Sequence, residues 1–169
     1  RNVGIKAASG EYIGFLDDDD EWLPEKIERQ MKVLQADPSI DAVTVLWKLY
    51  ENGKEIRKCE PYTADNLQFK VFLRDVAVFT STVIIKKSAI ERFGGFDGEL
   101  LRHQDLQFLV DALKESKFAV LPEYLVKLHA DSEINRPNVE KLIQAKKAFF
   151  QSVDGEFRKY SRSERTRIR

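Results

Sequence analysis

Residues 12–24 read YIGFLDDDDEWLP, and this stretch decides the fold. It opens with an apolar run, Tyr12 to Leu16, which is bounded by polar residues. Such a run is typical of a strand that is buried on both faces, as in a parallel sheet. Four aspartates, Asp17 to Asp20, follow directly, and Pro24 then suits the first turn of a helix. The stretch therefore predicts an α/β fold.

Helix and strand patterns alternate on both sides of this stretch. The apolar spacing, capping residues and turn residues give each pattern its boundaries. We expect helices at residues 2–8, 24–37, 63–73, 88–93, 105–113 and from 138 onward, and strands at 42–50, 55–58, 78–85, 118–121 and 124–129. Asn52-Gly53 predicts a hairpin turn, and Ser88 with Glu91 predicts a capping box.

The composition is that of a globular domain with its own core. Of 169 residues, 43% are hydrophobic and 33% charged, and 28 basic side chains balance 28 acidic ones. This balance disfavours a nucleic-acid partner, which usually selects a basic surface. The single Cys59 excludes an internal disulfide, and no apolar run is long enough to span a membrane. We therefore expect a cytoplasmic location.

The aspartate cluster is the strongest chemical signal. A solvated surface loop is the ordinary interpretation of such a cluster. Its place at the carboxyl end of a predicted strand favours a ligand site, because open α/β sheets bind ligands there. Hard divalent cations prefer carboxylate oxygens. An EF-hand is disfavoured, because Trp22 occupies the position that needs glycine when Asp17 is taken as the first loop residue.

A second signal is the segment FGGFDGELLRHQDLQFL, residues 93–109. A Gly-Gly turn leads to Asp97, and Asp105 follows at the predicted start of a helix. Aspartate is common at helix starts, so a capping role for Asp105 remains open beside a catalytic one. His129 ends a predicted strand, where a lone histidine is more often structural than a ligand.

Taken in order, these segments resemble the family 2 inverting glycosyltransferases of GT-A fold. The resemblance spans roughly residues 1–132 and depends on the ordered set: an Asn-x-Gly helix, a strand, an aspartate cluster with Trp22, and a Gly-Gly-Phe-Asp loop before a later aspartate. It implies a three-layer, Rossmann-like α/β fold. The family's first strand and nucleotide-gripping acids would precede Arg1, so we expect a GT-A domain without its N-terminal βα units, spanning residues 1–135. Residues 136–169 would form a C-terminal helix and a basic tail.

The resemblance also implies roles for individual residues. Asp105, preceded by Gln104 where relatives more often have Glu, would be the general base that takes a proton from the acceptor hydroxyl. A bound Mg²⁺ or Mn²⁺ would stabilise the departing nucleoside diphosphate. The implied residues fall into three sets: Asn2, Asp17 and Asp18 for donor binding; Asp19, Asp17 and His129 for the metal; Gly95, Phe96, Asp97 and Gln104 for the acceptor.

The implied reaction is metal-dependent transfer, with inversion, of a sugar from a nucleotide-sugar donor to a glycan or lipid-linked acceptor, as in polysaccharide biosynthesis. One rival is a metal-independent glycoside hydrolase that pairs Asp105 with Asp97 or Asp19. Another is a non-catalytic module that binds a divalent cation or a carbohydrate. The basic tail, residues 157–169, would be solvated or would contact anionic lipid at the inner face of the membrane. A sheet without its first strands would expose an edge, which favours a homo-oligomer.

Overall fold

A computed structural model describes residues 1–130 and 139–168 of the chain. Its helices are α1 Asn2–Ala7, α2 Lys26–Ala36, α3 Leu67–Leu73, α4 Lys87–Phe93, α5 Gln104–Glu115, α6 Val139–Ser152, α7 Asp154–Phe157 and α8 Arg162–Ile168, with a 3-10 turn, η1, at Thr80–Thr82. Its strands are β1 Tyr12–Gly14, β2 Glu21–Trp22, β3 Ala42–Glu51, β4 Lys54–Lys58, β5 Val83–Lys86 and β6 Phe118–His129.

One mixed sheet organises the molecule, with strand order β1-β5-β3-β6-β2 and with β4 paired to β3. The central pair, β3 and β6, is parallel, and the other pairs are antiparallel. The β3–β4 hairpin turns at Asn52-Gly53, where both residues have positive φ, 50° and 75°. These are the conformations that a tight hairpin requires, so the hairpin prediction is confirmed.

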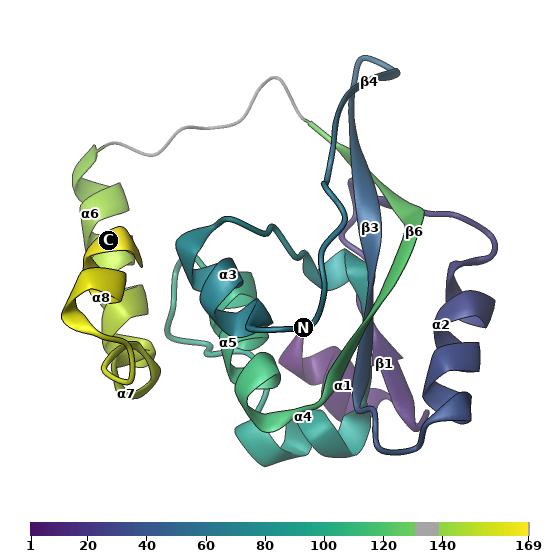
Figure 1. Ribbon diagram of the computed structural model, residues 1–169, viewed down its shortest axis with the longest axis horizontal. Helices are drawn as coiled ribbons and strands as arrows, with labels where there is room; N and C mark the ends of the chain where they lie inside the picture. The colour runs from purple at the N-terminus through teal and green to yellow at the C-terminus, as the bar shows by residue number, and fades with distance from the viewer. Residues whose placement is uncertain (131–138, 169) are drawn as a thin grey trace.

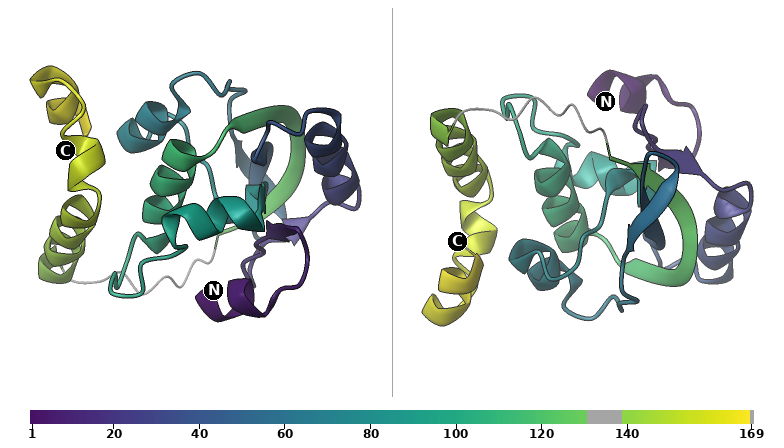
Figure 2. Two further views of the ribbon diagram at one scale, coloured as in Figure 1. Left: turned by 90° about the horizontal axis from the view of Figure 1, so that it is seen from below. Right: turned by 90° about the horizontal axis from the view of Figure 1, so that it is seen from above.

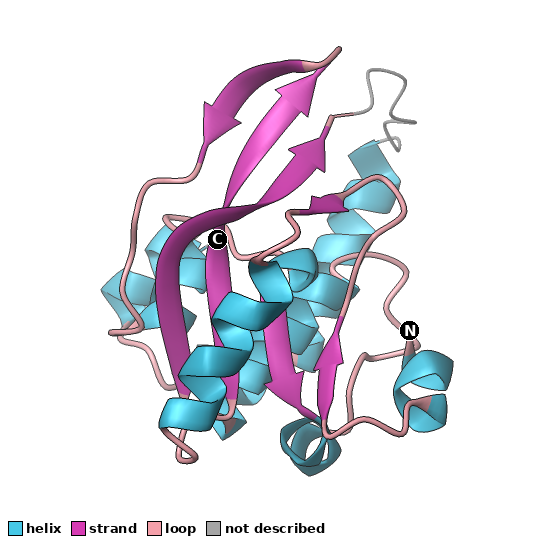
Figure 3. Cartoon of the chain, turned by 90° about the vertical axis from the view of Figure 1, so that its right-hand side faces the viewer, coloured by secondary structure: helices cyan, strands magenta, loops and turns pink. Residues whose placement is uncertain are grey.

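Helices cover both faces of the sheet in unequal amounts (Figure 1). Helix α2 packs alone on one face, where Leu34 meets Val43 and Ile84 (Figure 3). Helices α3, α4 and α5 cover the other face, and their largest core cluster includes the fully buried Phe108. Both views in Figure 2 place α6, α7 and α8 beyond this helical layer. The predicted α/β architecture is confirmed.

The C-terminal helices pack through aromatic side chains. Phe149 and Phe157 share a core cluster with Phe72 of α3, and the Tyr160 ring lies 4.8 Å from that of Phe69. In its described part, residues 157–168, the predicted basic tail begins at the last residue of α7 and forms α8 after a short turn. The predicted domain boundary at 135/136 lies outside the described residues. No helix in residues 1–130 and 139–168 is long and apolar enough to cross a membrane.

The apolar run that opens the acidic stretch differs from its prediction. Strand β1 lies at the end of the sheet, pairs antiparallel with β5, and buries only Ile13 fully. The prediction of a parallel strand buried on both faces is therefore wrong. The neighbouring strand, β5, runs in the direction opposite to β1, so the pair is antiparallel. β1 is the last strand in the order of the described sheet, so it pairs on one side only. Homo-oligomerisation through an exposed edge stays a prediction.

Several predicted boundaries shift for local reasons. Residues 78–85 are a strand only from Val83, because three buried hydroxyl residues form η1 first. The two strands expected at 118–121 and 124–129 are one continuous strand, β6, with register shifts opposite Leu46. Ser88 is not a cap: α4 begins at Lys87 with no side-chain capping bond, although it ends as predicted at Gly94, with φ of 87°.

Candidate active site

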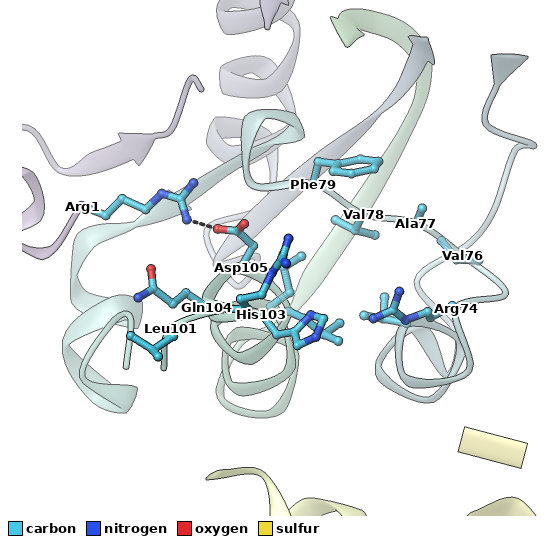
Figure 4. Close-up of a pocket in the computed structure, with 14 residues that line it drawn as sticks. Arg1, Arg74, Val76, Ala77, Val78, Phe79, Leu101, His103, Gln104 and Asp105 are labelled. Carbon is cyan, nitrogen blue, oxygen red and sulfur yellow. Dashed lines mark hydrogen bonds and ion pairs between the residues drawn. The ribbon is translucent and has the colours of Figure 1, made fainter. Parts of the chain in front are cut away.

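A single guanidinium joins the two acidic segments that the sequence singled out. Arg1 Nη2 lies 2.9 Å from Oδ1 of Asp17, and Arg1 Nη1 donates to Oδ1 of Asp105. Asp17 follows β1, and Asp105 lies in the first turn of α5. These carboxylates are 88 positions apart in the sequence, yet they bind the same side chain. Figure 4 shows the contact of Arg1 with Asp105. The predicted common location of the acidic cluster and Asp105 is therefore present.

Burial and charge act in opposite directions on Asp105. Burial raises the pKa of its carboxyl above the ordinary value, the charge of Arg1 lowers that pKa, and the charge of Asp17 raises it again. A carboxylate with a raised pKa is a stronger base, and the neighbouring guanidinium favours its ionised form. Asp105 therefore has an increased proton affinity beside a cation that favours its ionised form.

Ser81 in η1 organises the acidic loop from beneath. Its hydroxyl donates to Oδ2 of Asp20 at 2.5 Å and accepts the backbone N–H of Asp17 at 3.2 Å. Its carbonyl accepts the indole N–H of Trp22 at 2.7 Å. The pKa of Asp20 is raised, chiefly by burial, while the bond from Ser81 lowers it. Asp20 is thus committed to holding the loop.

The Trp22 ring also explains Gly14. A Cβ at Gly14 would lie 2.8 Å from the edge of that ring. The predicted close approach at this glycine is therefore made by a side chain rather than by another backbone.

The remaining acids of the loop are suited to a cation. Asp18 and Asp19 are exposed. The imidazole of His129 lies 3.9 Å from Glu21, and its ring lies 6.0 Å from that of Tyr50. Within the described ranges, no three acidic, histidine or cysteine side chains converge as metal ligands. The predicted trio of Asp17, Asp19 and His129 is therefore not assembled here as one ligand set. Mg²⁺, however, commonly takes only one or two protein carboxylates together with substrate phosphates, and the oxygens of this loop fit that type of site.

The glycine loop is fixed by Asn2. The Asn2 amide donates to the Phe96 carbonyl at 2.7 Å and accepts the Phe96 N–H at 3.0 Å. Gly95 has φ of 85°, and a Cβ there would lie 2.9 Å from Oδ1 of Asn2. The Phe96 ring is buried and stacks on Phe108, with ring centroids 4.2 Å apart. In this structure Asn2, Gly95 and the Phe96 ring therefore position the loop, and the substrate contacts predicted for them stay predictions.

Helix α5 supports the same loop from its other side. The buried Gln107 accepts the Asp97 N–H at 2.7 Å and donates to Asp111. Asp97 accepts the Glu99 N–H at 2.8 Å, which closes a tight turn. Gln104 donates to the Leu100 carbonyl at 2.5 Å. Of the predicted acceptor residues, Gln104 directly precedes Asp105 and lines the same cavity, whereas Asp97 is held through its backbone by Gln107 of the same helix.

A cavity of about 530 Å³ opens beside Asp105. Arg1 and Gln104 line it together with the apolar Val78 and Phe79 (Figure 4). A second hollow of about 430 Å³ is lined by Arg1, Asp17 and residues of α1 and β1. Arg1 lines both. The site thus has two compartments, one at the acidic loop and one at Asp105.

Two residues of this site were not predicted from the sequence. Arg1 directly precedes Asn2, and an arginine before a predicted helix does not by itself indicate a functional site. Ser81 lies inside a β-branched run that resembles an ordinary strand. Its only distinguishing mark is the succession of three hydroxyl residues, Thr80, Ser81 and Thr82, among apolar neighbours.

We expect replacement of Ser81 by alanine to loosen the acidic loop. The Asp20 carboxylate would lose a donor and the Asp17 N–H its acceptor, at a cost of about 1–3 kcal/mol in unfolding free energy. The hydrogen bond from Ser81 lowers the pKa of Asp20 in the wild type, so its loss should raise that pKa further. Carbon-detected NMR titration of Asp20 and urea unfolding measure both effects. Ser88→Ala, at an exposed serine of α4, is the control. An unchanged Asp20 titration in Ser81→Ala would contradict this role.

Comparison with known proteins identifies the class. The family model for glycosyl transferase family 2 matches residues 1–94. An uncharacterised glycosyltransferase of Methanocaldococcus jannaschii is 29% identical over 149 residues, covering 84% of this chain and 51% of that protein. YwdF, an uncharacterised glycosyltransferase of Bacillus subtilis, is 30% identical over 131 residues, covering 72% and 46%. The amylovoran biosynthesis glycosyltransferase AmsB of Erwinia amylovora is 26% identical over 138 residues, covering 76% and 45%.

Solved structures agree at the level of the fold. The crystal structure of S. aureus TarS 1–349 in complex with UDP-GlcNAc superposes with a TM-score of 0.67 at 18% identity, covering 90% of this chain and 45% of that one. The prediction of a GT-A fold is therefore confirmed. The chain belongs to glycosyl transferase family 2, and it spans about half the length of the curated relatives it matches.

Proposed function

We propose that the protein containing this chain transfers a sugar, with inversion and with a bound divalent cation, from a nucleotide-sugar donor to a hydroxyl group of a glycan or lipid-linked acceptor. The observation that carries the proposal is the shared bridge of Arg1 to Asp17 and Asp105. It joins the acidic loop that follows β1 to the half-buried carboxylate of Asp105 through one cationic group, and this supports a donor side and an acceptor side around Arg1. Family membership and the nucleotide-sugar complex of TarS support the donor class.

The chain's own residues divide the work of such a transfer. Asp105 accepts the proton of the acceptor hydroxyl as that oxygen attacks the anomeric carbon from the face opposite the leaving group. One such displacement inverts the anomeric centre. Asn2 and Gln107 hold the Gly95–Asp97 loop beside the attacking group through bonds to its backbone. The hydrogen bond between Ser81 and Asp20 fixes the acidic loop to η1.

Asp17 and Asp19 are the residues that would hold Mg²⁺ or Mn²⁺. When bound, such an ion supplies positive charge that stabilises a departing diphosphate. Asp18 would lie beside the donor, as the resemblance implies. His129, whose imidazole lies 3.9 Å from Glu21, would be a further ligand of the same ion.

The surroundings of Asp105 favour transfer over glycoside hydrolysis. A retaining or inverting hydrolase needs a second carboxyl group facing the first across the scissile bond. The charged groups that act on Asp105 are Arg1 and Asp17, but Arg1 binds both carboxylates, so the second carboxyl group is bridged to the first by a cation and does not face it across a free gap. Asp97, the partner considered for hydrolysis, is engaged in its own turn with Glu99.

The test uses the full-length protein that contains this chain. It is incubated with a panel of nucleotide-sugars and glycan acceptors, with Mn²⁺ or with EDTA, and the product linkage is assigned by NMR. We expect nucleoside diphosphate release that needs the cation, with about 10²-fold or greater loss in EDTA, and an inverted linkage. Undiminished transfer in EDTA or a retained linkage would contradict the proposal. Metal-independent cleavage of glycosides would favour the hydrolase, and cation binding without turnover would favour the binding module.

A further inference from the structure

A second group of cations lines the Asp105 cavity, apart from Arg1. Arg74 lies at the end of α3, and Arg102 and His103 lie just before α5. Figure 4 shows Arg74 across the cavity from Arg1, with Asp105 and His103 between them. Two segments that are 28 positions apart thus bring positive charge to one wall.

These two arginines have no acidic partner in the described part of the chain. Arg1 is neutralised by Asp17 and Asp105, but neither Arg74 nor Arg102 has a carboxylate oxygen within 4.0 Å there. Their charges reach His103: burial lowers the pKa of its imidazole, and the charges of Arg74, Arg102 and Lys146 lower it further. Within residues 1–130 and 139–168, the charges of Arg74 and Arg102 are therefore not paired with a carboxylate.

The backbone of this wall is held in a costly conformation. Arg74 has φ of 58° and His103 has φ of 65°, and neither residue is glycine, the residue that adopts positive φ without strain. Each such left-handed residue costs on the order of 1–3 kcal/mol, and strained residues of this kind cluster at ligand sites. Two of the four such residues in the described chain lie on this one cavity.

The location of the wall separates it from the donor compartment. Asp17 lines the second hollow and not this cavity, whereas Arg74 and Arg102 share the cavity with Asp105. The group that Asp105 would deprotonate belongs to the acceptor. An anion bound by the two arginines would therefore be carried by the acceptor and not by the donor diphosphate.

We propose that Arg74 and Arg102 form a subsite for an anionic group, a phosphate or a carboxylate, on the acceptor. Guanidinium groups bind both through paired hydrogen bonds of matching geometry. Val78 and Phe79, which line the same cavity, would contact the apolar part of the same molecule. This proposal rests on the proposed function, because it names the class of acceptor that Asp105 would activate.

Binding to the chain itself gives the first test, which needs no turnover. The arginine Nε–Hε resonances are followed by NMR during titration with glycerol 3-phosphate, glucuronate, glycerol or UDP. We expect Arg74 and Arg102 to shift with glycerol 3-phosphate, glucuronate or both, which also identifies the anion, and not with glycerol. If neither glycerol 3-phosphate nor glucuronate shifts these resonances, the proposal is overturned. Displacement of the bound anion by equimolar UDP would also overturn it.

Turnover in the full-length protein gives the second test. Loss of one charged contact corresponds to about a 10–100-fold change in binding, so Arg74→Gln and Arg102→Gln should each raise KM for an anionic acceptor by that factor. Neither variant should change KM for the uncharged acceptor analogue or the rate of donor hydrolysis. Arg74→Lys should recover part of the loss, and Arg29→Gln, on α2 across the sheet, is the matched control.

The two proposals fail in different ways. If no nucleotide-sugar is turned over with any acceptor, the proposed function fails while the NMR titration still decides the anion subsite. If turnover occurs but both glutamine variants keep the wild-type KM for anionic acceptors, the subsite is wrong and the glycosyltransferase proposal stands.

Discussion

Replacement of Asp105 by asparagine is expected to lower sugar transfer by about 10²–10⁴-fold, the usual contribution of a general base. Asparagine keeps the shape of the side chain and can still accept a hydrogen bond from Arg1, but it cannot take the acceptor proton. The proposed donor contacts lie at the acidic loop, so donor affinity should change little. Initial rates in the full-length protein and calorimetric titration with the donor measure the two quantities separately.

The pH profile adds a second criterion for Asp105. Its pKa is raised, and a base works only when it is ionised, so wild-type activity should fall as pH drops through a value above that of an ordinary aspartate. Asp105→Asn should lose this acidic limb. Asp154→Asn, at an exposed residue paired with Arg158, is the matched control and should leave the rate unchanged. Near-normal turnover in Asp105→Asn would remove this residue from the mechanism.

Replacement of Lys26 by methionine is expected to stabilise the chain. Lys26 begins α2 and is fully buried, and its Nζ has no hydrogen-bond partner in the described residues. It lies 4.0 Å from the centre of the Trp22 ring. Burial lowers the pKa of its amine from 10.5 to about 7. Methionine fills a similar volume without an amine that must be desolvated.

The sign of the pH dependence follows from this lowered pKa. Between pH 7 and 10.5 the unfolded chain binds a proton at Lys26 that the folded chain does not, so stability rises with pH in that window. Each unit of pKa shift corresponds to about 1.4 kcal/mol, so the free-energy cost of charging the buried Lys26 amine approaches about 5 kcal/mol. The whole cost applies at pH values below the pKa of Lys26 in the folded chain. Lys26→Met should therefore gain about 1–4 kcal/mol near pH 6 and progressively less toward pH 10.

Urea unfolding of both chains across this range measures the difference. Lys32→Met is the matched control, because Lys32 lies on the same helix, is exposed and pairs only with Glu28. Its effect should stay within about 0.5 kcal/mol at every pH. A Lys26→Met chain that is less stable than wild type near pH 6, or a gain independent of pH, would contradict the argument.

Much of the fold follows from local patterns in the sequence. The Asn52-Gly53 turn, the helix stop at Asp37 and the glycine end of α4 each depend on residues within a few positions, and the structure has all three. The ordered motifs also carry the family, because they keep their sequence order whatever the intervening loops do. Asp17 and Asp105 are recognisable for the same reason.

Side-chain partners are less predictable, because they come from distant segments. Phe96 looks like a substrate residue beside its glycines, but the Phe108 ring 12 positions later takes it into the core. Ser81 looks like part of a strand, but the acidic loop 61 positions earlier turns its hydroxyl into a support for Asp20.

The sequence by itself determined the α/β class, the family and the two acidic segments, since each is written in contiguous residues with a fixed spacing. Three features appear only in the tertiary structure: β1 is an antiparallel edge strand, Arg1 joins Asp17 to Asp105, and Arg74 and Arg102 line one cavity without an ion-pair partner among the described residues. Such facts depend on which distant segments the packing of the sheet brings within a few ångströms, and local patterns contain no record of that distance.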